Sequence, residues 1–391
     1  MDIKKRSEEL FEELVAIRRD LHMNPELSGK EIRTSKKIIE YLENWGIEYI
    51  GNVAETGVIA LIRGKKEGKT VAARADIDAL PITEDSDRPY ISRNIGVMHA
   101  CGHDVHTAIL LGTAKIFKEM ENELEGNVKL FFQPAEEAIG GAERMIKDGC
   151  MANPDVDYVI GLHVMPYIDA GYVELKYGKL NASSGEFFIT IKGKSGHGAY
   201  PDTTIDAIVL AGNVITALQT LVSRNISPLD SVVLTIGKIN GGTKNNIIAD
   251  EVVMSGTLRT LDADTRKHAK AIIERIVENT AKTYGGEGRV EFTDGYDALI
   301  NDDEIVDVIK ETAERVLGMD KVLFKEATSM GAEDFSYYID EAKGAFYHLG
   351  CGNQAKGITA ALHNNNFDID ENCIKTGVQL QTECILELLR K

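Results

Sequence analysis

Apolar runs that alternate with helical patterns constrain the fold of this chain most. Runs that are apolar along their whole length are typical of strands in a sheet covered on both faces. Their alternation with helices favours an α/β/α layer structure, so we expect a mixed, mostly parallel central sheet. The strands and helices are expected at 58–62, 71–75, 110–120, 128–132, 140–148 and 158–163.

The alternation is interrupted after Ser183-Ser184-Gly185. The following segment has the order strand, long helix, two strands, long helix and strand, which is the βαββαβ order of a ferredoxin-like unit. Helix and strand alternation resumes after Gly295. We therefore predict a discontinuous outer domain, 1–184 with 295–391, and an inserted domain, 185–294.

Charge and cysteine content limit the partners and the compartment. The chain carries 44 Lys and Arg against 62 Asp and Glu, a formal net charge of −18. An acidic field repels nucleic acid and anionic membranes, so neither is expected as a partner. No run reaches the roughly 18 apolar residues of a membrane span. The cysteines, five in number and scattered, fit a reducing compartment, and a cytoplasmic location is predicted.

The densest polar cluster is MHACGHDVHTA, residues 98–108. Cys101 and His103 are two apart, so both side chains point to one face of an extended segment. Thiolate and imidazole are ligands that zinc and its neighbours favour. A histidine-rich loop that only caps the following helix would give the same pattern, and the motif alone leaves both interpretations open.

A second cluster is FFQPAEEAIGGA, residues 131–142. Glu136 and Glu137 follow an apolar strand at its carboxyl end, which is where open α/β sheets place their active sites. One carboxylate can bind a metal while the other transfers protons. A solvated acidic pair at the start of a helix is the alternative, because the helix dipole favours Glu there.

Two further histidines are ordinary when each is taken alone. His163 ends an apolar strand, and His363 precedes an expected C-terminal helix. Together with the clusters above they complete a set of five possible metal ligands beside Glu136: Cys101, His103, Glu137, His163 and His363. That set exceeds the needs of one tetrahedral structural site and suits two ions that share a water.

Seven motifs in order carry a resemblance to a known family: ARADIDALP, MHACGHDVHTA, QPAEE, GLH, GKSGHGAYP, GAEDF and LHNNNFDID. With RRDLHMNPELSGKE at 18–31, they resemble the aminoacylase and carboxypeptidase family of dinuclear metallohydrolases nearly end to end. The resemblance is nearest to its amidohydrolase branch, which includes hippurate hydrolases, N-acetyl-diaminopimelate deacetylases and plant auxin-conjugate hydrolases.

The resemblance implies a catalytic domain with an inserted lid domain, and a homodimer formed through that lid. It also implies two divalent ions (zinc, manganese, cobalt or nickel) on the five ligands, with Glu136 as general base. Many relatives carry a histidine near Asp76 that this sequence lacks. The resemblance therefore implies that Cys101 bridges the metals, and that Asp76 and Asp78 orient a ligand imidazole.

Three lid residues match substrate-contacting positions of the family. His197 matches the residue that reaches the substrate carbonyl, and Asn246 and Arg259 match residues that contact a carbonyl or carboxylate. The sequence departs from the pattern at Ala249, where relatives commonly carry Pro, and at Asn364-Asn365, where Ser-Pro is usual.

These features predict a metal-dependent amidohydrolase that cleaves N-acyl amino acids or related small conjugates. A dipeptidase or carboxypeptidase of the same family is the alternative, because Arg259 would serve a substrate carboxylate in either case. A catalytically inactive binding protein of the same fold is a second alternative. The presence of Glu136 beside the full ligand set favours an enzyme.

Overall fold

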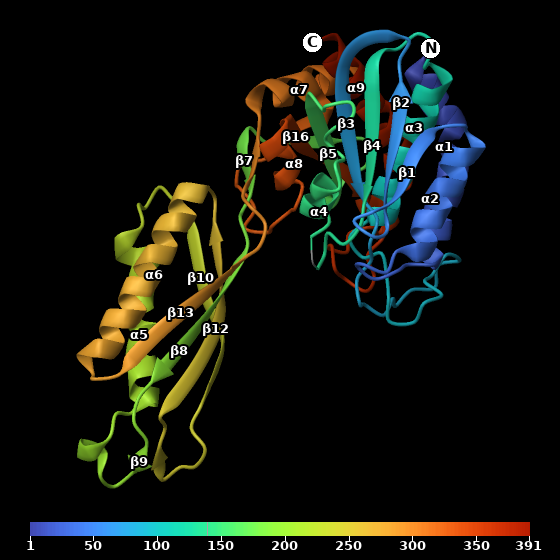
Figure 1. The fold of residues 1–391 in the computed structure, drawn as a ribbon. Coiled ribbons are helices and arrows are strands. Elements are labelled where there is room, and N and C mark those ends of the chain that lie inside the picture. Colours follow the sequence, from blue (N-terminus) through green and yellow to red (C-terminus); the bar gives the residue numbers. More distant parts are fainter. Residues whose placement is uncertain (139) are drawn as a thin grey trace. The chain divides into compact units, whose positions relative to one another are not determined.

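A computed structural model describes residues 1–138 and 140–391, which form two compact units (Figure 1). Unit 1 comprises Met1–Leu180, Ile300–Ala327 and Asp334–Lys391. Unit 2 comprises Asn181–Leu299 and Thr328–Glu333. The domain boundaries expected from the sequence stay a prediction.

Unit 1 contains an eight-stranded mixed sheet in the order β1-β2-β4-β3-β5-β16-β6-β15. Its strands are β1 (Glu48–Val53), β2 (Gly57–Arg63), β3 (Lys66–Asp76), β4 (Glu125–Gln133), β5 (Tyr158–Asp169), β6 (Val173–Leu175), β15 (Val322–Phe324) and β16 (Lys343–Gly352). The central strands β4, β3, β5 and β16 run parallel to one another. The pairs β1–β2 and β2–β4 on one side, and the pair β16–β6 on the other, are antiparallel. The predicted α/β class with a mixed, mostly parallel sheet is confirmed.

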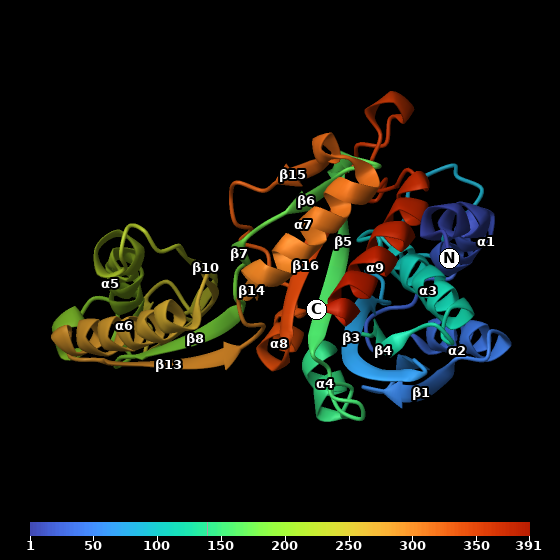
Figure 2. The same ribbon diagram turned by 90° about the horizontal axis from the view of Figure 1, so that it is seen from above.

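Helices cover both faces of this sheet (Figure 2). Along β4, Val128, Leu130 and Phe132 point into the main core, which they share with α1, α3 and α9. Phe131 points to the other face and stacks on Tyr338 of α8, with 5.4 Å between ring centroids. The helices of unit 1 are α1 (Ile3–Met23), α2 (Ile32–Asn44), α3 (His103–Glu119), α4 (Ala142–Lys147), α7 (Asp303–Leu317), α8 (Ser336–Glu341) and α9 (Asn372–Arg390).

Parallel pairing brings three chain segments to one edge of the sheet. Asp76 at the end of β3 is in register with Gln133 at the end of β4. Arg74 is in register with Gly161 of β5, two residues before His163. Because parallel strands end on the same side, the segments that follow β3 and β4 meet β5 there, at the edge where α/β enzymes bind ligands.

Unit 2 contains a four-stranded antiparallel sheet in the order β10-β12-β8-β13. Its chain order is β8 (Gly185–Lys192), α5 (Ala207–Thr220), β10 (Val232–Gly241), β12 (Glu251–Thr260), α6 (Ala263–Thr283) and β13 (Glu287–Asp294), which is the predicted βαββαβ order. Phe187, Ile189, Val214 and Ile273 lie in a separate core between sheet and helices.

Short elements complete the chain. The strand pairs β9 (Gly196–His197) with β11 (Ile247–Ile248), and β7 (Gly178–Asn181) with β14 (Leu299–Asn301), form two small sheets. Single helical turns occur at Pro201–Thr203, Leu221–Asn225, Met319–Lys321 and Gln354–Lys356.

Candidate metal centre

The thiol and the first imidazole of the site are presented at the start of α3. Gly102 stands between Cys101 and His103 with φ +86°, a left-handed conformation that favours glycine. A Cβ at this position would lie closer than 3.0 Å to Val164 Cγ2. The glycine therefore allows the backbone to turn tightly against β5, and the donor atoms of Cys101, His103 and His163 all lie within 4.8 Å of one another.

Hydrogen bonds hold Nδ1 of His163 and Nδ1 of His103, and they leave Nε2 of each ring available to a metal. His163 donates from Nδ1 to the carbonyl of Val164 (2.8 Å), so its Nε2 carries the lone pair that faces Cys101 Sγ at 3.3 Å. His103 donates from Nδ1 to Asp78 Oδ1 (3.1 Å). This is how metal-binding histidines are commonly held, with one nitrogen donating to an oxygen and the other free to coordinate.

The carboxylates enter from the turn that follows β4. Ala135, which follows Pro134, has φ +58°, and Glu136 and Glu137 come directly after this left-handed residue. The backbone N–H of Glu137 donates to Asp78 Oδ2 (3.0 Å). Glu137 Oε1 lies 3.2 Å from Nε2 of His363 and 3.9 Å from Nε2 of His103.

The donors form overlapping groups with Cys101 at the junction. One group is Cys101, His103 and His163, and another is Cys101, Glu137 and His363. A third group consists of His103, Glu136 and Glu137. All five predicted ligands and the predicted base therefore come together in unit 1, and Cys101 belongs to two of the donor groups.

The chemistry of these donors fits divalent cations. Nε2 of His103 is buried and has no hydrogen-bond partner within residues 1–138 and 140–391, which is costly unless something binds it. Burial raises the pKa of the Cys101 thiol well above its ordinary value, and the nearby Glu137 and Glu136 raise it further. A thiolate here requires a neighbouring positive charge, which a bound metal supplies.

Asp76 holds a different histidine from Asp78. His106 donates from Nδ1 to Asp76 Oδ1 (2.5 Å), and its Nε2 accepts from the backbone N–H of Val164 (2.9 Å). Both ring nitrogens of His106 are thus engaged within the protein. Arg74 donates to the other oxygen of Asp76 (2.6 Å). Asp78 therefore holds Nδ1 of the candidate ligand His103, whereas Asp76 accepts from His106 and its Oδ2 lies 3.5 Å from Nε2 of His103.

Another polar residue of the 98–108 motif serves the fold rather than the donor set. Asp104 is fully buried and accepts from Arg18 Nε (2.7 Å) and His22 Nδ1 (2.8 Å), which joins α1 to the start of α3. The RRDLHMN segment gave a signal for this arrangement, because a buried Arg and His require a buried carboxylate partner.

The candidate substrate residues lie in unit 2. His197 pairs across β9 and β11 with Ile247, beside Asn246, whose carbonyl accepts from the N–H of Gly198 (2.9 Å). Nδ1 of His197 accepts from the N–H of Ala199 (3.0 Å), so in the neutral ring Nε2 carries the proton and can donate. Arg259 lies on β12.

The two departures from the family pattern fit their surroundings. Ala249 is buried, and its carbonyl accepts from the N–H of Ala207 at the start of α5. Asn364 Oδ1 accepts from the N–H of Asn366, and the carbonyl of Asn365 accepts from the N–H of Asp85. These bonds stabilise the turn after His363.

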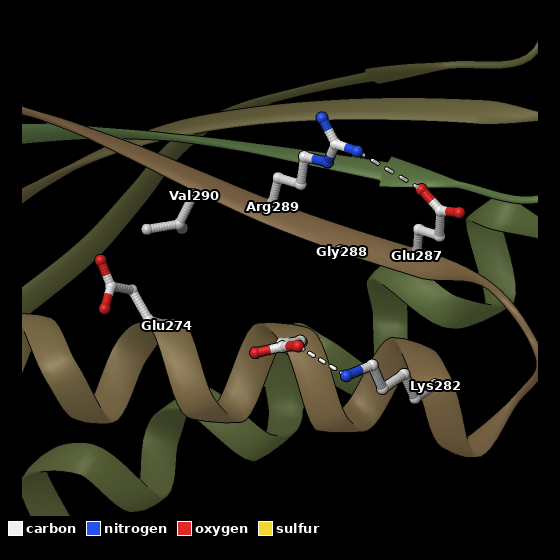
Figure 3. A pocket seen from close by; sticks show the side chains of 7 residues that line it. Glu274, Lys282, Glu287, Gly288, Arg289 and Val290 are labelled. Carbon is white, nitrogen blue, oxygen red and sulfur yellow. Dashed lines mark hydrogen bonds and ion pairs between the residues drawn. The ribbon is translucent and has the colours of Figure 1, made fainter.

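A surface pocket between α6 and β13 of unit 2 is charged but carries none of the candidate site residues (Figure 3). Glu278 pairs with Lys282, and Arg289 pairs with Glu287. These opposite charges neutralise one another at an exposed surface.

Comparison with known proteins places the chain in a family. Residues 72–387 match the model of peptidase family M20/M25/M40. The chain is 42% identical over 365 residues to an N-acetyl-L-cysteine deacetylase of Bacillus subtilis, covering 93% of this chain and 85% of the relative. It is 40% identical over 379 residues to thermostable carboxypeptidase 2 of Saccharolobus solfataricus, covering 96% of this chain and 95% of the relative.

A solved structure agrees with these relatives. A dinuclear metal-binding peptidase of the M20 family from Bacillus subtilis superimposes with a TM-score of 0.86 at 34% identity, covering 98% of this chain and 99% of that chain. The family model spans more than half of the chain and includes the whole donor set. The chain therefore belongs to peptidase family M20/M25/M40 and is a hydrolytic enzyme.

Proposed function

We propose that this enzyme is a metal-dependent amidohydrolase that releases the amine from N-acyl amino acids or related small conjugates. The observation that carries the proposal is the convergence of thiol, imidazole and carboxylate donors at the edge of the sheet, with Cys101 common to two groups. The deacetylase relative supports the substrate class, because its name specifies an N-acetyl amino acid.

The residues assigned to hold the metals are Cys101, His103, Glu137, His163 and His363. A bound pair of divalent ions supplies Lewis acidity, which polarises a carbonyl and lowers the pKa of water from about 15.7 towards roughly 7. Sulfur and nitrogen donors favour zinc, cobalt or nickel, and manganese is compatible through availability.

Glu136 is the proposed general base. It lies next to Glu137 in the same turn and is 9% exposed. A carboxylate oxygen of Glu136 lies within 4.8 Å of the donor atoms of His103 and Glu137. A carboxylate in this position can take a proton from the attacking water and return it to the departing amine. We assign Asp78 to hold the ring of His103 and Asp76 to hold His106 during this cycle.

Residues of unit 2 are the proposed substrate contacts. His197 presents Nε2–H as a donor, because its Nδ1 is occupied by the N–H of Ala199. Such a donor stabilises the oxyanion that forms when the amide carbonyl is attacked. Asn246 adjoins His197, and Arg259 provides a guanidinium suited to the carboxylate of an amino-acid product.

Carboxypeptidase action on short peptides is the second candidate. It is favoured by the relative named as a thermostable carboxypeptidase. The two activities share the attack on an amide carbonyl and differ in what is joined to the amino acid, an acyl group or a peptide. A screen that includes both N-acyl amino acids and dipeptides separates them.

We propose a cytoplasmic homodimer formed through unit 2, without nucleic acid or membrane partners. The helical segment Ala207–Asn225 is long and apolar enough to cross a membrane by length and composition, yet only 33% of it is buried within the protein. Its Ile208, Val209 and Val222 are about half exposed, and β10 is an edge strand. A second copy of the chain would cover both surfaces. Sedimentation equilibrium should give twice the chain mass.

A screen for amine release tests the function. Metal-free enzyme is loaded with Mn²⁺, Co²⁺ or Zn²⁺ and incubated with N-acetyl and N-benzoyl amino acids, indole-acetyl amino acids and dipeptides. We expect hydrolysis of N-acyl amino acids, and a fall of about 10²- to 10⁴-fold in Glu136→Gln with metal binding retained. Preference for dipeptides would support the second candidate, and no turnover of any substrate would contradict the proposal.

A further inference from the structure

Glu31 has its carboxylate directed away from the helix that it begins. It occupies the N-cap position of α2, yet its side chain makes no capping hydrogen bond there. Glu26 performs that task instead, because its carboxylate accepts from the N–H groups of Arg33 (3.0 Å) and Thr34 (2.8 Å). The Glu31 carboxylate is therefore not needed to cap α2.

The Glu31 carboxylate instead joins three separate segments in the interior. The residue is 0% exposed. Its Oε1 accepts from the N–H of Gly29 (2.7 Å) and from the N–H of Ala135 (3.0 Å), and its Oε2 accepts from the hydroxyl of Thr56 (2.6 Å). A buried carboxylate is tolerated only when donors compensate for its lost hydration, and here they do.

One of these donors belongs to the turn that presents the candidate base. Ala135 adopts φ +58°, a conformation that costs a non-glycine residue energy and persists where the surroundings hold it. The next two residues are Glu136 and Glu137. The turn is held on one side by Glu31 through the N–H of Ala135, and on the other by Asp78 through the N–H of Glu137.

We infer that Glu31 is a positioning residue of the metal centre, which sets the direction in which Glu136 and Glu137 leave the turn. This inference rests on the proposed metal centre. Outer carboxylates that hold ligand-bearing segments typically affect metal affinity or activity by about 10- to 100-fold when removed. Glu31 touches no candidate donor atom directly and acts through the backbone of Ala135.

The test compares Glu31→Ala with the matched control Glu26→Ala. Both remove a carboxylate near the start of α2, but only Glu31 contacts the turn at Ala135. Metal-free proteins are titrated with Mn²⁺ by calorimetry, and kcat and KM are measured on an N-acetyl amino acid at saturating metal. We expect Glu31→Ala to weaken Mn²⁺ binding by about 10- to 100-fold and to lower kcat more than it raises KM. Glu26→Ala should lower only thermal stability.

Conservative variants separate positioning from general destabilisation. Glu31→Gln keeps an oxygen that can accept from Gly29 and Ala135, so its Mn²⁺ affinity should lie closer to wild type than that of Glu31→Ala. Glu31→Asp withdraws the carboxylate by roughly 1.5 Å and should weaken binding even if Glu31→Ala does not fold. Folding is checked by circular dichroism.

Three results would overturn the inference. They are unchanged Mn²⁺ affinity and kcat in folded Glu31→Ala or Glu31→Asp, an equal loss of affinity in Glu26→Ala, and a failure of Glu31→Gln to recover any affinity. Wild-type protein that binds no divalent ion would instead refute the metal centre itself, and with it this role.

Discussion

Substitution of Gly102 tests whether the backbone between the first two ligands must turn as it does. Gly102→Ala places a Cβ at φ +86° and closer than 3.0 Å to Val164 Cγ2. The left-handed conformation costs an L-residue roughly 1–2 kcal/mol, and forcing an extra carbon into a packed interior costs about 1–3 kcal/mol. We therefore expect a loss of about 2–5 kcal/mol in the free energy of unfolding of the metal-free protein.

Calorimetric unfolding of the metal-free variant is the assay, and for a chain of 391 residues the loss corresponds to a fall of about 2–6 °C in Tm. Gly149→Ala is the control, because Gly149 has φ +90° but nothing within 4 Å of an added Cβ. Gly149→Ala should lose only the roughly 1–2 kcal/mol of unfolding free energy that the left-handed conformation costs. Adding Val164→Ala to Gly102→Ala should recover part of the loss by removing the overlapping methyl. If Gly102→Ala is no less stable than Gly149→Ala, the close approach of Gly102 to Val164 of β5 does not restrict this position.

Three further predictions concern other residues. Alkylation of Cys101 should release bound metal and abolish turnover, as measured by metal analysis, and alkylated enzyme that keeps both would exclude a ligand role. His197→Ala should lower kcat by about 10²- to 10³-fold without changing Mn²⁺ affinity. Burial opposes ionisation of Glu174, but hydrogen bonds from His348 and Tyr167 outweigh it and lower its pKa from 4.5 to about 2. Because the folded-state pKa is depressed, its stabilising effect is present above about pH 4.5 and is lost as pH falls towards 2. Chemical denaturation across this range should show a smaller loss for Glu174→Gln than for wild type.

Most of the proposed ligands could be predicted from the sequence because they lie near a strand end or a helix start, whereas His363 lies in a turn and has φ +61°. Glu136 and Glu137 follow an apolar strand, and parallel pairing fixes which strand ends meet. His163 was expected at a strand end but lies within β5, two residues beyond the last residue of β5 that pairs with β3. Cys101 and His103 adjoin the start of α3. Hydrophobic periodicity and the order of strands along the chain therefore indicated that these residues lie near one another.

The partners of buried carboxylates were harder to predict. The family resemblance implied the same role for Asp76 and Asp78, and only atomic positions separate the carboxylate that accepts from His106 from the one that accepts from His103. Glu31 contacts Ala135 across 104 positions of sequence, and no local pattern encodes such a bond. Strand neighbours were equally hidden, since β2 and β3 are consecutive in the chain but both pair with β4.

We expect hydrolysis to depend on metals held by the donors around Cys101. The most direct measurement is a titration of metal-free enzyme with Mn²⁺ or Zn²⁺ while amine release from an N-acetyl amino acid is followed. We expect no turnover without metal, and a rise in turnover that reaches its plateau at about two equivalents of metal per chain. Full turnover in metal-free enzyme, or metal binding that restores no activity, would contradict it.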